Sequence, residues 1–267
     1  MEVLKRFLAH RSQSLGQDWI GTLAAFVDRL IFEKQIHQNP PVVVYTMPKV
    51  GSSSIASSLA KVYPGIVIHT HAFTANHPKW QIRRLHYWAL VQNRPIRVIS
   101  PIREPIGRNV SGFFQTFQKT TGVAYQDSRF SLEELKSLFL LNYPHQYLLE
   151  WFEQRIQKVL GIDVYATPFP QRGFAFYTRR NIQLCVLRSE LDNQNKERVL
   201  RNFLELGGFH ITNTNVGEQK LYASTYRELK QNMKPPRDYV DWMCRSRYFR
   251  HFYSAEMIEN VRRRWME

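Results

Sequence analysis

The sequence predicts an α/β fold, with a mainly parallel sheet flanked by helices and extra helices at both ends. Three runs rich in β-branched residues, 42–46, 66–69 and 96–100, alternate with segments of helical periodicity. The apolar runs are continuous, which is typical of parallel strands covered on both faces. Strands that alternate with helices predict a layered fold, and we expect one domain over residues 1–267.

Helical spacing and proline positions set the elements of the N-terminal half. Apolar residues recur every three or four positions within 18–36 and end before Pro40-Pro41, which predicts a helical extension within residues 1–40. The helix after the first strand covers about 53–62 and stops before Pro64-Gly65. A further helix is expected over 78–92, between the second and third strands.

The C-terminal half predicts more helices and a fourth buried strand. A turn at 101–105 leads into a helix over about 106–119, and 120–130 reads as a loop. Short strand-like pieces are expected around Pro168 and Pro170, and a buried strand over 183–188. The remaining predicted helices cover 132–141, 145–160, 194–206, 217–232 and 254–265.

Charge and cysteine content narrow the class of protein. The net charge is +15, from 37 basic against 22 acidic residues, and should attract nucleic acid, anionic lipid, acidic polysaccharide or a polyanionic cofactor. Only Cys185 and Cys244 are present, so no disulfide framework is indicated. No apolar run is long enough to span a bilayer, and no secretory signal is visible. We expect a soluble, cytoplasmic protein. A helix within residues 1–36 could touch a membrane or a partner, although packing on its own core is favoured.

Residues 42–58 have the composition of an anion site. A β-branched strand passes through Pro48, Lys49, Gly51 and Ser52–Ser54 into a helix. The free N–H groups and dipole of a helix N-terminus favour negative charge, and Lys49 adds a full positive charge. In the usual nucleotide loop the lysine follows the last glycine and precedes a magnesium-binding hydroxyl. Here it precedes Gly51, which argues against a magnesium-dependent NTPase.

Residues 98–114 repeat this arrangement with arginines. A strand again feeds a helix, with Arg103 and Arg108 at the entry and Ser111 two turns beyond Arg103. Arginine offers forked donors that suit bidentate phosphate binding, and Arg108 either contacts phosphate or pairs with an acid. Two such turns in one parallel sheet open toward the same edge, where one ligand with two phosphate groups would satisfy both.

The two motifs together resemble the sulfotransferases that use 3′-phosphoadenylyl sulfate (PAPS). Residues 48–54 are similar to the family's 5′-phosphosulfate loop, and 103–113 to its 3′-phosphate motif, in which an Arg and a Ser eight residues later hold the phosphate. Carbohydrate sulfotransferases are most alike, especially the heparan 2-O and 6-O types and bacterial capsule-associated relatives. The resemblance implies a P-loop-like core, PAPS as donor, PAP as product, no metal, and these donor-binding residues: Lys49, Val50, Gly51, Ser52, Ser53, Ser54, Arg103 and Ser111.

The likeness covers roughly residues 41–265, with departures. Segments 187–191 and 252–258 resemble the family's Arg-x-Glu-Asp-Leu segment and its closing helix. Val50 replaces a hydroxyl residue common after the lysine, and the Arg188-Ser189-Glu190 stretch lacks the second acid, so we assign that stretch no role.

Candidate catalytic residues lie at the end of the second strand, in His69-Thr70-His71. Sulfuryl transfer to a hydroxyl needs positioning, charge stabilisation and a base, and His is the usual base. A His-x-His pair lies close to the transferred group in 2-O-type relatives, so we expect His71 as general base, with His69 assisting. Two structural histidines, or half of a metal site, are the alternatives. Lys49 should stabilise charge on the leaving oxygen.

Two other functions stay open. A nucleotide-dependent kinase would need a magnesium ligand after the loop and an acidic partner, and neither is evident in the sequence. A non-catalytic binder of nucleic acid or another polyanion would rest on net charge alone. The sequence does not fix the acceptor or the oligomeric state. The acceptor is expected to be a glycan or a small molecule, and an acidic one would suit the positive net charge. Peripheral membrane contact is compatible with it, and no nucleic-acid partner is expected.

Overall fold

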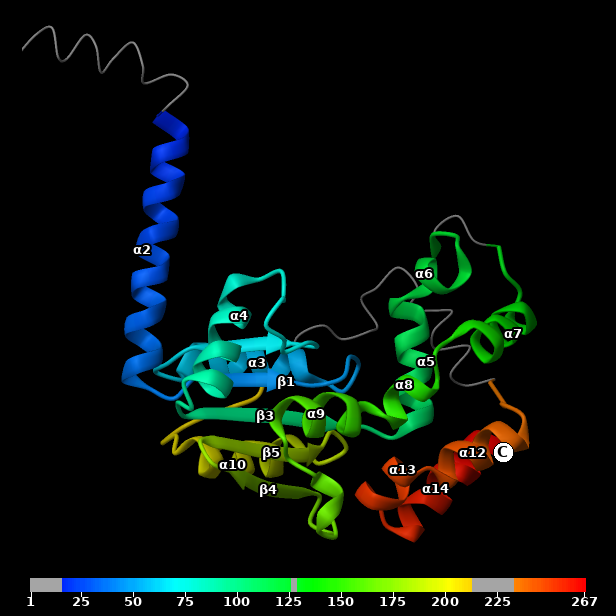
Figure 1. Ribbon diagram of the computed structural model, residues 1–267. Coiled ribbons are helices and arrows are strands. Elements are labelled where there is room, and N and C mark those ends of the chain that lie inside the picture. Colours follow the sequence, from blue (N-terminus) through cyan, green and yellow to red (C-terminus); the bar gives the residue numbers. More distant parts are fainter. Residues whose placement is uncertain (1–15, 126–128, 213–232) are drawn as a thin grey trace, which may run out of the picture.

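The computed structural model describes residues 16–125, 129–212 and 233–267. Its centre is a five-stranded sheet in the order β2-β1-β3-β5-β4 (Figure 1). The first four strands of that order are parallel, and β4 is antiparallel to β5. Their bounds are β1 Val42–Tyr45, β2 Val67–Thr70, β3 Ile96–Ile102, β4 Phe174–Arg179 and β5 Ile182–Arg188. The predicted α/β fold with a mainly parallel sheet is confirmed.

The sheet ends in a hairpin that the sequence did not predict. β4 begins at Phe174, after the strand-like pieces expected around Pro168 and Pro170, and turns at Arg180, whose φ is 51°. β4 is an edge strand with half of its residues exposed, so it lacks the continuous apolar run of the buried strands. The prolines lie before β4, where a missing N–H costs no ladder hydrogen bond.

Helices surround the sheet, and several are more broken than predicted. The expected helix 106–119 divides at Thr116, and 145–160 forms three short pieces. Two helices over 237–252 were not predicted, and the helix expected over 217–232 lies outside the described residues. The helical segments are α2 Gly16–Gln38, α3 Ser52–Val62, α4 Trp80–His86, η1 Tyr87–Val91, α5 Pro105–Gln115, α6 Phe117–Thr121, α7 Leu132–Asn142, α8 Gln146–Leu149, η3 Phe152–Gln157, α9 Lys158–Leu160, η4 Val164–Ala166, α10 Asn193–Leu204, α12 Arg237–Arg245, α13 Arg247–Phe252 and α14 Ala255–Met266.

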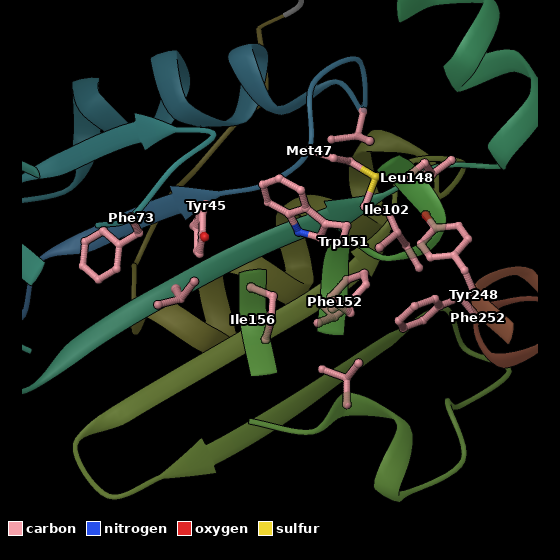
Figure 2. Packing of buried hydrophobic residues seen from close by; sticks show 14 of the residues in the cluster. Tyr45, Met47, Phe73, Ile102, Leu148, Trp151, Phe152, Ile156, Tyr248 and Phe252 are labelled. Carbon is pink, nitrogen blue, oxygen red and sulfur yellow. The ribbon is translucent and has the colours of Figure 1, made fainter. Parts of the chain in front are cut away.

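The two faces of the sheet bury two hydrophobic clusters. Because side chains alternate along a strand, Val42 and Val44 pack toward α3 and α10, whereas Val43 and Tyr45 face the larger cluster on the other side. That larger cluster is rich in aromatic rings, and Trp151, which is fully buried, lies among them (Figure 2). Its ring meets Tyr45 edge-on at 5.5 Å between centroids. The core thus fixes the β1 strand from both sides.

The helix α2 stands clear of the sheet for most of its length (Figure 1). Within residues 21–38, whose burial the structure describes, 21–31 are all exposed, and Phe32 and Ile36 in the last turns are buried. The favoured packing of this helix on its own core is therefore found in its last turns. Among the described helices, none combines the length and apolar character needed to cross a bilayer.

The strand order places a topological switch between β1 and β3. The chain passes from β1 through α3 to β2 on one side, and β3 then adds on the other side of β1. The loops leaving β1 and β3 therefore lead to helices on opposite faces of the sheet, α3 on one and α5 on the other. Ligands of open α/β sheets bind at such a point.

Candidate functional site

The first turn at the switch point, residues 46–51, leads into α3 with an open helix start. Lys49 and Gly51 both have positive φ, 70° and 75°, on either side of Val50. Gly51 is the N-cap of α3, with no side-chain cap and no acidic residue in the first turn. The first backbone N–H groups of α3 thus carry no side-chain acceptor from this cap, a geometry that favours an anion.

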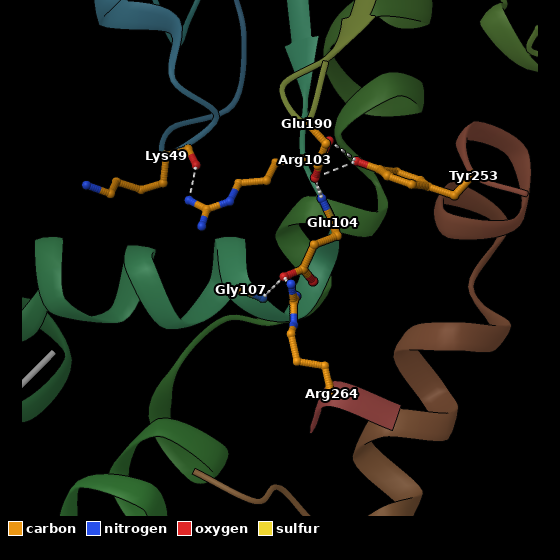
Figure 3. A network of polar contacts seen from close by, with 7 residues as sticks. All are labelled: Lys49, Arg103, Glu104, Gly107, Glu190, Tyr253 and Arg264. Atoms are coloured by element: carbon orange, nitrogen blue, oxygen red, sulfur yellow. Dashed lines mark hydrogen bonds and ion pairs between the residues drawn. The ribbon is translucent and has the colours of Figure 1, made fainter. Parts of the chain in front are cut away.

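The second turn lies directly against the first. The Nη1 group of Arg103, just after β3, donates a hydrogen bond of 3.1 Å to the carbonyl oxygen of Lys49 (Figure 3). In that view the Lys49 side chain extends away from Arg103. The Tyr248 hydroxyl donates to the Arg103 carbonyl at 2.9 Å and accepts from its N–H at 3.2 Å. Ser111 follows on α5 and is 8% exposed.

Arg108 is buried and hydrogen-bonds to the backbone of the first turn. It is 1% exposed, and its Nε donates to the Pro48 carbonyl at 3.1 Å. Its Nη1 donates to the Asn109 amide oxygen at 3.0 Å and to the Tyr143 hydroxyl at 2.8 Å. All of these acceptors are neutral, and within the described ranges it forms no ion pair. Arg108 therefore holds the turn in place, a role outside the two alternatives that the sequence offered.

The start of α5 already carries a carboxylate, unlike that of α3. Glu104 is the N-cap and accepts from the Gly107 N–H at 2.9 Å. The same carboxylate pairs with Arg264 of α14 at 2.5 Å. The Glu104 N–H in turn donates to Glu190 at 2.8 Å, and Glu190 also accepts from the Tyr253 hydroxyl (Figure 3). This network ties the second turn to the C-terminal helices.

The two candidate histidines have different environments. The ring of His71 is bonded through Nδ1 to the Thr46 carbonyl at 2.6 Å, so Nδ1 carries the proton and Nε2 of the neutral ring is an acceptor. His71 is exposed, which suits a base that meets substrate. His69 Nε2 lies 2.9 Å from the Ser52 hydroxyl. Burial, with His71 and Lys79 nearby, lowers the pKa of His69 to about 4, so it is neutral at pH 7.

The structure brings most of the predicted site residues to one edge. The His69 and His71 rings lie 5.0 Å apart, next to the turn that contains Lys49. Val50 is buried, and Ser53 and Ser54 are half-buried in the first turn of α3. The Ser52 hydroxyl forms a hydrogen bond with His69. Arg103 and Ser111 share the second strand-to-helix unit.

Two residues at this edge were missed from the sequence. The Ser189 hydroxyl, just after β5, donates to the Val50 carbonyl at 2.5 Å, and Tyr248 brackets Arg103. A cavity of about 110 Å³ lies between this segment and the first turn, lined by Gly51, Ser54 and Lys196 among others. Because β5 is parallel to β3, the carboxyl ends of both strands lie at the same edge of the sheet. The position of Ser189 directly after β5 could therefore have predicted its place in the site. Tyr248 lies on a helix that the sequence did not predict.

One of three comparisons with known proteins found a match. A family model described as "Putative capsular polysaccharide synthesis protein" (NKWYS) matches residues 125–254. No match was found among curated proteins or among solved structures. The match supports a function related to capsular polysaccharide. It spans the elements from α7 to α13, and it leaves out the turns that contain Lys49 and Arg103.

Proposed function

We propose that this protein is a PAPS-dependent sulfotransferase that acts on a hydroxyl of a polysaccharide or a related acceptor. The observation that carries the proposal is the contact between the two basic turns, in which Arg103 donates to the Lys49 carbonyl at 3.1 Å. Turns so close can hold two anionic groups of one ligand. The capsule-related match to residues 125–254 supports a glycan as acceptor.

The residues of the edge fit this donor because the N-terminus of α3 is uncapped and lacks acidic residues. PAPS would supply the sulfuryl group. Residues 49–54 would hold its phosphosulfate end, and Arg103 and Ser111 its 3′-phosphate. Lys49 and the N–H groups of α3 stabilise negative charge that develops on the leaving oxygen.

His71 carries the proton-transfer part of the mechanism. Its Nδ1–H is held by the Thr46 carbonyl, which leaves Nε2 as the atom that accepts the acceptor's hydroxyl proton. His69 stays neutral and fixes the Ser52 hydroxyl at the start of α3. His69 is therefore a positioning residue in this mechanism.

Calorimetry with adenosine 3′,5′-bisphosphate tests the donor site. We expect binding by the wild type, and about tenfold weaker binding or worse for Lys49→Ala, because a charge-assisted contact with phosphate is lost. Lys61→Ala is the matched control, since Lys61 is exposed in the last turn of the same helix. Absence of binding by folded wild-type protein at millimolar ligand contradicts the proposal.

Sulfate transfer from labelled PAPS to capsular polysaccharide tests the base. We expect His71→Ala to lose at least about 100-fold in turnover, as is typical for a general base, while donor affinity is kept. His210→Ala, which removes an exposed histidine, should retain wild-type turnover. Wild-type activity in His71→Ala would remove this residue from the mechanism. Magnesium-dependent ATP turnover by the wild type would instead favour a kinase.

A further inference from the structure

A cavity of about 530 Å³ lies at the carboxyl end of β5, outside the two turns described above. Its lining includes Arg188, Arg250 and His251, together with the aromatic rings of Tyr165 and Phe169, and contains no acidic residue. A space of this size with rings and a few charged groups has the character of a ligand pocket. The charge on its walls selects an anion.

Arg188 is the strongest indication of such a ligand. It is 5% exposed, and its guanidinium donates to the Gln171 carbonyl and to the Met257 sulfur, both neutral. Its Nε has no hydrogen-bond partner, and no carboxylate in the described ranges pairs with it. A buried charge without a counter-charge is costly, so an anion bound in the cavity would stabilise it.

The neighbouring elements add to this positive character. The cavity includes Ser254 and Ala255, the N-cap and first residue of the 12-residue helix α14, whose positive dipole end lies there. Arg250 is exposed on α13. Glu256, in the first turn of α14, is exposed and does not line the cavity.

We propose that this cavity binds an anionic sugar unit, bearing a carboxylate or a sulfate, of a polymeric acceptor. The inference rests on the proposed function. β5 lies three strands from β2, about 14 Å at the usual strand spacing, so the unit bound here is a different sugar from the one that meets His71. The acceptor is therefore a chain. Except for Ala255, the lining lies within the segment that matches the capsular polysaccharide family.

The cavity also adjoins the second turn through a chain of hydrogen bonds. Tyr253, which lines it, donates to Glu190, and Glu190 accepts from the Glu104 N–H next to Arg103. Figure 3 shows this chain of contacts. An acceptor in the cavity would therefore lie beside the residues that support the donor turn.

Calorimetry on the full chain tests the proposal with three hexasaccharides: hyaluronan, carboxyl-reduced hyaluronan, and a sulfated galactan without carboxylates. We expect an anionic probe to bind and the carboxyl-reduced one to bind about tenfold more weakly or not at all, because a charge-assisted contact is lost. Hyaluronan binding assigns the site to a carboxylate, and binding of the galactan alone assigns it to a sulfate. Arg250→Glu should weaken the anionic probe by about tenfold or more. Arg263→Glu, an exposed arginine on α14 away from the cavity, should change nothing.

Equal affinity of the neutral and anionic probes, or of Arg250→Glu and wild type, overturns the proposal. The proposal is also overturned if the protein binds adenosine 3′,5′-bisphosphate but binds neither anionic probe. If Arg250→Glu weakens binding of the nucleotide as much as binding of the anionic probe, the cavity belongs to the donor, and the proposal is again overturned. If the wild type does not bind the nucleotide but binds an anionic probe, and Arg250→Glu weakens that binding, the proposed function is contradicted and the anion site in the cavity is supported.

Discussion

Lys49 occupies a left-handed backbone conformation, at φ 70°, that costs a non-glycine residue about 1–2 kcal/mol. Arg180 in the β4–β5 turn has the same feature, at φ 51°, away from the candidate site. At Lys49 the strain lies in the turn that we propose binds the donor. Glycine would accept either conformation without strain.

At this scale we expect Lys49→Gly to raise the free energy of unfolding by about 0.5–1 kcal/mol, since relief of strain exceeds the added chain entropy. Arg180→Gly should give a similar gain. Only the first variant should lose binding of adenosine 3′,5′-bisphosphate. Urea denaturation together with calorimetry measures both quantities. A loss of stability in Lys49→Gly alone would show that the lysine side chain stabilises the fold.

At the scale of elements, the turns that build the candidate site were predictable because each is local. The β-branched run before Lys49 and the small residues after it indicate a strand, a turn and a helix within a few positions. The same holds for β3, Arg103 and α5. Residues that reach the site through tertiary packing were not predictable in this way. Tyr248 bonds Arg103 across 145 positions, from a helix whose short, arginine-rich sequence gives a weak periodic signal.

The cavity at β5 shows the same limit. Arg188 belongs to a segment that was left without a role because it lacks the second acid of the family's pattern, and the residues that surround Arg188 in the fold are distant along the chain. Its partners, Gln171 and Met257, lie on either side of it in sequence. The edge strand β4 was misplaced for a related reason, since half of its residues are exposed and its burial depends on its pairing with β5.

Helix α2 supports a prediction of its own. Its exposed stretch, 21–31, gains little from the rest of the protein, whereas Phe32 packs edge-on against Trp80 with centroids 4.9 Å apart. We expect Leu30→Ala, which shortens an exposed side chain of α2, to change the free energy of unfolding by less than about 0.5 kcal/mol. Phe32→Ala should cost about 3 kcal/mol, because its ring is buried. Chemical denaturation of both variants checks this, and a large loss in Leu30→Ala would show that the exposed stretch of α2 stabilises the fold.

At the scale of the whole molecule, buried histidines set how stability depends on pH. His145 is buried; its Nε2–H donates to the Phe139 carbonyl at 2.8 Å, and its Nδ1 accepts from the Tyr239 hydroxyl at 3.0 Å. Burial lowers the pKa of His145, and it outweighs the Phe139 carbonyl, which favours the charged ring. Burial likewise lowers the pKa of His69, His86 and His251.

These directions predict that the protein loses stability as the pH falls below 6.5, the ordinary pKa of histidine. Above that value both states are neutral at these rings. Below it, the unfolded chain binds protons that the folded one does not, so each histidine contributes a slope of at most about 1.4 kcal/mol per pH unit until its folded pKa is reached. Glu190 opposes the trend by at most one proton, because its pKa is raised, chiefly by burial.

Urea denaturation at constant ionic strength between pH 7.5 and 5 measures the slope above the usual range of carboxyl groups. His145→Gln should flatten it, although the variant is less stable at pH 7.5; a slope unchanged in that variant would show that His145 is protonated in the folded protein.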